Sequence, residues 1–141
     1  MEANELRIGN LIQLFRRPSD MKKTPHKVRS IFWHDDGYYC IELDDLFIVN
    51  TLAGIEPIDL TEEWLLKLGF TKSISPDGDD NYHIMNKDGF STDFTVEHWT
   101  NTQKHSKYHN HFHIYGARRN IKYVHELQNL YYALTGKELN I

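Results

Sequence analysis

The sequence predicts an α+β fold, in which an SH3-like small β-barrel at residues 1–59 is followed by an α+β lobe at residues 60–141. Short runs of β-branched and aromatic residues alternate with turn residues through the first 59 positions. A capped helical segment follows at 60–69, and apolar residues recur at helical spacing between 121 and 134. The chain of 141 residues is 40% hydrophobic and 13% aromatic, which is enough for a packed core.

The first lobe is expected to contain short strands at residues 7–14, 27–33, 38–43, 46–49 and 55–58. Asp35-Asp36-Gly37 is a turn signal between the second and third of these, which we expect to form a hairpin. Pro57 has no N–H for a ladder and therefore belongs on an edge. Five strands at this spacing are typical of a small, partly open barrel of the SH3-like kind.

The second lobe is expected to run in the order α-β-β-β-β-α. Its first helix has Thr61 as N-cap and Gly69 as a left-handed stop. Strand signals follow at residues 71–74, 82–86, 90–99 and 112–115. The closing helix is expected from Ile121, with Asn120 as its N-cap and Gly136 as its stop, and its apolar stripe consists of Ile121, Val124, Leu127, Tyr131 and Leu134.

Four of the nine histidines lie in the stretch 105–113, written HSKYHNHFH. In a strand, His109, His111 and His113 share one face while Phe112 and Ile114 share the other. We expect the histidines to form the solvated face and the apolar pair to be buried. The alternative is a metal site, because His-x-His places two imidazoles about 6.6–7 Å apart along one face. It needs a further ligand, most plausibly His98 or Glu97.

Two segments combine basic and aromatic residues in a way that could hold a phosphate backbone and stack bases. One spans residues 104–122 and the other spans residues 16–29. The candidate nucleic-acid contacts are Arg16, Arg17, Lys22, Lys23, Lys104, Lys107, Tyr108, Arg118 and Arg119. The net charge of −4 favours the simpler interpretation, in which these residues are solvated loop side chains.

Other classes of function find little support. The single cysteine, Cys40, excludes an internal disulfide and a cysteine-based zinc finger, and its strand-like context predicts a small buried core residue. The chain has no nucleophile elbow, phosphate loop or dinucleotide-binding glycine pattern, so we expect no catalytic residue and no cofactor. It also has no signal-peptide pattern and no apolar run of about 18 residues, which predicts a cytoplasmic protein. Trp33, Trp64 and Trp99 are expected to be core or interface anchors.

Three segments resemble a family of small uncharacterised proteins encoded by bacteriophages and prophages of anaerobic gut bacteria. They are residues 4–10 (NELRIGN), 55–70 (IEPIDLTEEWLLKLGF) and 121–139 (IKYVHELQNLYYALTGKEL), of which the last is the most specific. The resemblance implies a phage context and a location inside the bacterial host cell. It implies no catalytic residue, and the histidine-rich strand is not part of it.

Together these observations predict a non-enzymatic phage accessory protein that binds a phage or host protein or associates with itself. The high aromatic content could supply interface residues, and the candidates for partner binding are Trp99 and Tyr132. Tyr132 is preferred to Tyr131 because Tyr131 belongs to the apolar stripe of the closing helix and Tyr132 does not. Nucleic-acid binding through the two basic segments is the first alternative. Metal binding through the histidine cluster is the second.

Overall fold

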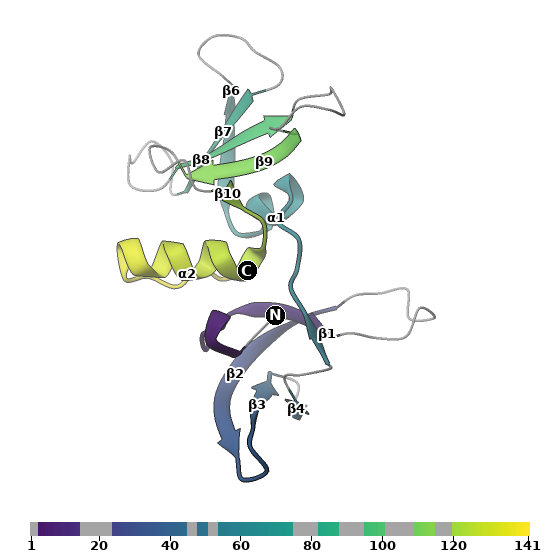
Figure 1. Cartoon of the computed structure of the whole chain (residues 1–141). Helices are drawn as coiled ribbons and strands as arrows, with labels where there is room; N and C mark the ends of the chain where they lie inside the picture. The colour runs from purple at the N-terminus through teal and green to yellow at the C-terminus, as the bar shows by residue number, and fades with distance from the viewer. Residues whose placement is uncertain are drawn as a thin grey trace. The chain divides into compact units, whose positions relative to one another are not determined.

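The computed structural model describes residues 3–14, 24–44, 48–50, 54–74, 82–87, 95–100, 109–114 and 120–141. The chain divides into two compact units, each coloured by residue number in Figure 1. Unit 1 comprises residues 1–59 and 123–138, and unit 2 comprises residues 60–122 and 139–141. Both units mix helix and antiparallel sheet, so the α+β class is correct.

Unit 1 is built on a five-stranded sheet that follows a short 3-10 helix, η1 (Ala3–Glu5). The strands are β1 (Leu11–Leu14), β2 (Pro25–His34), β3 (Tyr38–Leu43), β4 (Ile48–Asn50) and β5 (Ile55–Glu56). All pairs are antiparallel, and the strand order is β4-β3-β2-β1-β5.

The predicted SH3-like barrel is not supported. Closing a barrel requires the two edge strands to pair. Here β4 and β5 stand at opposite edges, and within the part of the chain that is described nothing pairs one with the other. The edge strands have only three and two residues, so each offers few backbone groups for closure. The strand positions were well predicted, but their assembly is an open sheet.

The core of unit 1 lies on one face of this sheet. It consists of Leu6, Ile12, Val28, Ile41, Leu43 and Ile55, with Leu14 and Ile31 packed against it. Strand β2 supplies both halves of this core, because its first residues pair with β1 and its later ones with β3. A register shift between Val28 and Ser30 marks an irregularity within the β2–β3 pairing.

The closing helix α2 (Val124–Thr135) belongs to unit 1, although the sequence alone placed it in a lobe at residues 60–141. Val124, Leu127 and Tyr131 are buried as predicted, and Gly136 ends the helix in the left-handed conformation with φ of 70°. Three details of the prediction were wrong. The helix N-cap is Tyr123, because Asn120 and Ile121 pair with a strand instead of capping and starting the helix, and Leu134 is 61% exposed.

Side-chain amides join α2 to the first turn of the chain. The buried Gln128 accepts a hydrogen bond from the Leu11 N–H (2.8 Å) and donates one to the Gly9 carbonyl (3.4 Å). Asn10 donates through Nδ2 to Asn129 Oδ1 (2.9 Å), while its own Oδ1 accepts from the Arg7 N–H (2.7 Å). Because these bonds satisfy backbone groups that would otherwise be orphaned, they explain why the helix packs against β1.

Unit 2 contains a second five-stranded antiparallel sheet in the order β10-β9-β8-β7-β6. Its elements are α1 (Glu62–Lys67), β6 (Phe70–Ile74), β7 (Tyr82–Lys87), β8 (Thr95–Thr100), β9 (His109–Ile114) and β10 (Asn120–Ile121). Thr61 caps α1 by accepting from the Trp64 N–H (3.3 Å), and Gly69 follows with φ of 81°, as predicted. The strand β10 was not predicted, because two residues at the start of an apparent helical stripe carry no strand signal of their own.

The buried hydrophobic residues described in unit 2 lie on or next to α1, on strands β6, β8, β9 and β10, and near the C-terminus. They are Leu60, Leu65, Leu68, Phe70, Val96, Phe112, Ile114, Ile121 and Leu139. Within the described ranges, no helix of either unit is long and apolar enough to cross a lipid bilayer.

Candidate functional site

The end of the β2–β3 hairpin gathers aromatic side chains on both of its faces. Trp33 lies opposite Tyr39 and the two rings meet edge to face, with centroids 4.8 Å apart and planes at 79°. His34 lies opposite Tyr38 and their rings are stacked, with centroids 4.7 Å apart and planes at 5°. We call residues 32–39 the hairpin tip. Cross-strand aromatic pairs of this kind hold two strands in register.

One face of the hairpin tip continues the core of unit 1 outward. Ile31 is opposite Ile41, and two residues further along Trp33 is opposite Tyr39, so the two pairs share a face of the hairpin. Ile41 is fully buried and Ile31 is half-buried, whereas Trp33 is 58% and Tyr39 is 44% exposed. The apolar face of the hairpin is therefore buried at Ile41 and becomes exposed to solvent at Trp33 and Tyr39.

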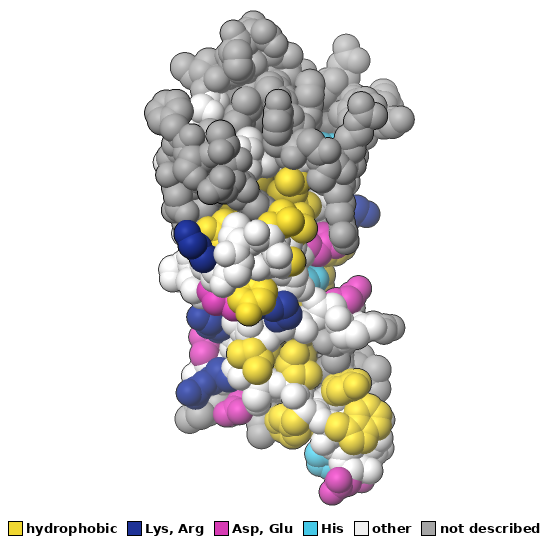
Figure 2. Space-filling model, turned by 90° about the vertical axis from the view of Figure 1, so that its left-hand side faces the viewer, with side chains coloured by type: hydrophobic (Ala, Val, Ile, Leu, Met, Phe, Trp, Pro, Cys, Tyr) yellow, Lys and Arg dark blue, Asp and Glu magenta, His cyan; other side chains and the backbone are white. Residues whose placement is uncertain are grey.

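Three of the exposed aromatic residues lie close together in the hairpin tip. Phe32, on the other face, is 38% exposed and adjoins the pair in sequence. At the lower end of Figure 2, where the β2–β3 hairpin lies in Figure 1, hydrophobic side chains gather beside a histidine and acidic side chains. Single exposed apolar residues are common on soluble proteins, but a cluster of large ones is typical of an interaction surface.

The turn that joins the two strands is acidic and well defined. The Gly37 N–H donates to the His34 carbonyl (2.9 Å), and Gly37 has φ of 88°, a conformation that favours glycine. The Asp36 N–H donates to His34 Nδ1 (3.2 Å), which joins the turn to the stacked His34–Tyr38 pair. The sequence predicted this turn and both strands correctly.

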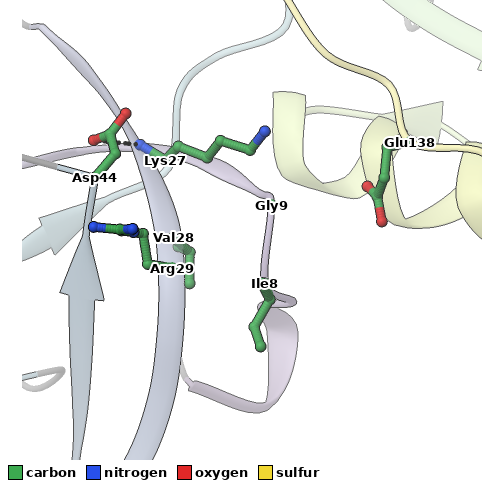
Figure 3. Close-up of a pocket in the computed structure, with 7 residues that line it drawn as sticks. All are labelled: Ile8, Gly9, Lys27, Val28, Arg29, Asp44 and Glu138. Carbon is green, nitrogen blue, oxygen red and sulfur yellow. Dashed lines mark hydrogen bonds between the residues drawn. The ribbon is translucent and has the colours of Figure 1, made fainter.

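A second feature of unit 1 is an open groove of about 450 Å³, shown in Figure 3. Its lining residues are Ile8, Gly9, Lys27, Val28, Arg29, Asp44 and Glu138. Both acids already have partners: Asp44 accepts from the Lys27 N–H (3.1 Å), and Glu138 accepts from Arg7 Nη2 (2.8 Å). The groove mixes both signs of charge, and its described lining contains neither a serine, a cysteine nor a histidine.

Tyr132, one of the two predicted partner-binding residues, is exposed as expected. The guanidinium of Arg7 lies over its ring, with Cζ 3.8 Å from the centroid, and the same guanidinium bonds Glu138. One face of the ring is thus occupied by a cation of the same unit. Tyr132 contributes to holding α2 near the first turn, in addition to any contact with a partner.

The other predicted partner-binding residue and most of the metal candidates have side chains outside the described residues. The backbone register still locates their positions: Trp99 is paired with His111, Glu97 with His113, and His98 with Phe112. Because directly opposite positions share a sheet face, position 97 lies on the face of His113 and position 98 on the face of Phe112. Of the two extra ligands considered for a metal, only Glu97 is therefore in register with the histidine face.

The apolar half of the strand prediction is confirmed, since Phe112 and Ile114 are both buried. His113, by contrast, is half-buried where full exposure was expected. Its position beside the short strand β10 explains the difference, because Asn120 is paired directly with it. His109 and His111 have side chains outside the described residues. Among the residues that are described, no three metal-binding side chains cluster.

All the predicted nucleic-acid contacts lie outside the described residues. This holds for Arg16, Arg17, Lys22 and Lys23 in one segment and for Lys104, Lys107, Tyr108, Arg118 and Arg119 in the other.

His125, in the first turn of α2, is a buried titratable group that sequence reasoning did not single out. Burial lowers its pKa from the ordinary value of 6.5, and the neighbouring carboxylates of Glu126 and Glu5 only partly oppose this. Its ring is stacked on Tyr123, with centroids 5.7 Å apart, and its Nδ1 has no hydrogen-bond partner within the described structure. The physical consequence is a neutral imidazole at pH 7.

Sequence reasoning named Trp33 only as a core or interface anchor and did not name Tyr39. Exposure excludes the core role for Trp33. The signal that could have found the pair was present: counting outward from the Asp35-Asp36-Gly37 turn puts residues 33 and 39 opposite each other. Cys40 was predicted correctly as a small buried residue. The third tryptophan, Trp64, is half-buried on α1.

Comparison with known proteins returned no matching family model, no matching curated protein and no matching solved structure.

Proposed function

We propose that this chain is a non-enzymatic phage accessory protein that binds a protein partner through the hairpin tip. The observation that supports the proposal most strongly is the exposed Trp33–Tyr39 pair, which continues a buried core face into solvent. Tryptophan and tyrosine are the residues most enriched at the energetic centres of protein interfaces. Removing the exposed part of these two side chains from water on binding a partner lowers the free energy of the complex.

The geometry of the sheet makes this surface accessible. Strand β1 pairs with β2 over Pro25–Lys27, and β4 pairs with β3 over Cys40–Glu42. In the described structure the hairpin tip therefore lies beyond both flanking strands and is a two-stranded arm. Neither edge of the hairpin tip is therefore paired with another strand of the described structure.

The remaining parts of the proposal rest on the sequence. The absence of catalytic motifs supports a binding role over an enzymatic one, and the resemblance of three segments to phage proteins supports a phage context and a cytoplasmic location. Two of those segments meet in unit 1, where Arg7 and Asn10 bond Glu138 and Asn129 of the third. This convergence supports a structural role for the shared segments, which leaves the hairpin tip available for binding.

The test compares wild type with the double variant Trp33→Ala/Tyr39→Ala. A tagged protein captures candidate partners from cells that carry the phage, and each candidate is then purified and titrated against both forms by calorimetry. We expect the double variant to bind the true partner at least about tenfold more weakly, as for loss of an interface centre.

Leu134→Ala is the matched control, because Leu134 is also an exposed large apolar side chain but lies on α2. It should leave the affinity unchanged. Circular dichroism and thermal melting establish that all forms are folded. Equal affinities for wild type and the double variant would refute the proposed surface.

A further inference from the structure

The hairpin tip is an anionic as well as an aromatic surface. Residues 30–43 contain Asp35, Asp36 and Glu42 but no lysine or arginine. Glu42 is engaged by the Ser30 hydroxyl, which donates to it at 2.8 Å. Asp35 and Asp36 are exposed, and Asp36 Oδ2 lies 3.4 Å from His34 Nδ1. Among the described residues, neither aspartate forms an ion pair with a lysine or an arginine.

The acidic turn and the aromatic pair are held together by the same two strands. One to three residues of the hairpin separate Trp33 and Tyr39 from the two aspartates, and the turn is stabilised by its own hydrogen bonds. The two rings meet edge to face with their centroids 4.8 Å apart, and Trp33 is 58% and Tyr39 is 44% exposed, so aromatic surface remains available to a group that arrives from solvent. Carboxylates beside perpendicular aromatic rings favour a cation, which ring faces attract and carboxylates bond.

We propose that the hairpin tip recognises an arginine or lysine side chain presented by the protein partner. The cation packs on the rings of Trp33 and Tyr39 and is bonded by the carboxylates of Asp35 and Asp36. Arginine suits this arrangement better than lysine, because its planar guanidinium stacks on an aromatic ring while its edge donates to a carboxylate. This inference rests on the proposed function, since it specifies the chemistry of the same surface.

The charge also argues against a nucleic-acid partner at this surface. A phosphate backbone approaching the exposed rings would meet two carboxylates, whereas nucleic-acid binding draws its affinity from neutralised phosphates. A protein segment with basic side chains meets complementary charge instead, which speeds association and selects the partner.

The experiment titrates the full chain with two short glycine–serine peptides that differ only in carrying two arginines or two glutamines. Binding is followed by the NMR shift of the Trp33 indole N–H, assigned by its loss in Trp33→Phe. We expect the arginine peptide to shift this resonance saturably, and more weakly as salt is raised. Asp35→Asn/Asp36→Asn should weaken its binding by about three- to tenfold, the sum of two exposed charge contacts.

Asp59→Asn is the control for the loss of an exposed carboxylate outside the hairpin, and it should leave the affinity unchanged. Equal shifts with the glutamine peptide, or no shift with the arginine peptide at the highest soluble concentration, would overturn the inference. A shift produced only by single-stranded oligonucleotides would also overturn it and assign the tip to nucleic acid.

The same variants separate this inference from the proposed function. If Trp33→Ala/Tyr39→Ala abolishes binding of the purified partner while Asp35→Asn/Asp36→Asn does not, the surface is correct and the cation chemistry is wrong. If neither variant affects the partner, the surface itself is wrong.

Discussion

The root and the tip of the β2–β3 hairpin have the same alternating pattern of residues, yet they have opposite surroundings. At the root, Val28, Leu43 and Ile41 face the core and are almost completely buried. At the tip, Trp33 and Tyr39 continue the same face and are largely exposed. Because burial converts apolar area into stability, the root is expected to hold unit 1 together and the tip to be available for contacts with other molecules.

The acidic side chains near the root also differ from those at the tip, because they have hydrogen-bond partners within the hairpin. Asp44 accepts from the Lys27 N–H and donates its own N–H back to the Lys27 carbonyl (3.0 Å). Ser30 bonds Glu42 across the strands. At the other end of the hairpin, Asp36 Oδ2 lies 3.4 Å from His34 Nδ1, and neither Asp35 nor Asp36 forms an ion pair with a lysine or an arginine of the described structure.

The largest expected effect is at the root. Ile41→Ala removes a fully buried side chain and leaves a cavity, so it should lower the free energy of unfolding by about 2–5 kcal/mol. The measurement is urea denaturation followed by circular dichroism. Tyr39→Ala, two residues away on the same face, is the matched control and should cost clearly less. Equal losses at the two positions would remove the distinction between root and tip.

The next effect concerns the amides that join α2 to the first turn. Gln128→Leu keeps the size of the side chain but leaves the Leu11 N–H and the Gly9 carbonyl without their partner. A buried donor without an acceptor costs about 1–3 kcal/mol, and the same denaturation experiment should show a loss of this size. Leu134→Ala on the exposed side of α2 should be nearly neutral. A neutral Gln128→Leu variant would mean that packing alone positions the helix.

A smaller effect depends on pH. Since burial lowers the pKa of His125, the folded state binds a proton less readily than the unfolded state, whose pKa is near 6.5. The resulting stability is fully present above about pH 6.5 and is lost as pH falls through the folded-state pKa. His125→Phe removes this proton while retaining an aromatic ring to stack on Tyr123.

The measurement compares urea midpoints at pH 7.5 and pH 5.0. Wild type should lose more stability between the two values than His125→Phe. An identical loss in wild type and His125→Phe would show that His125 does not contribute to acid sensitivity.

The smallest expected effect is at the tip. A double-mutant cycle of Trp33→Ala and Tyr39→Ala should yield a coupling of about 0.5–1.5 kcal/mol, the usual value for an edge-to-face aromatic pair. A coupling comparable to the loss in Ile41→Ala would mean that the pair is a structural part of unit 1, which would weaken the case for a binding surface.

The strand and turn positions of unit 1 were predictable because they depend on local signals. The Asp35-Asp36-Gly37 turn and the strands on either side follow from residues within a few positions of one another. The candidate site was only partly predictable. Trp33 was named, but whether an aromatic residue in a strand is covered depends on which other segments reach it, and alternation alone does not show that.

The sequence by itself determined the α+β class, the hairpin, and the ends of the helices at Thr61, Gly69 and Gly136, since caps and left-handed stops involve only neighbouring residues. Only the tertiary structure decided that α2 joins the first unit, because Gln128 bonds a backbone group 117 residues earlier in the chain. It also decided that the first sheet stays open and that Ile121 leaves the helical stripe to pair with Phe112. Contacts between distant segments leave no period in the sequence, and those contacts determine which apolar residues are covered and which, like Trp33, remain exposed.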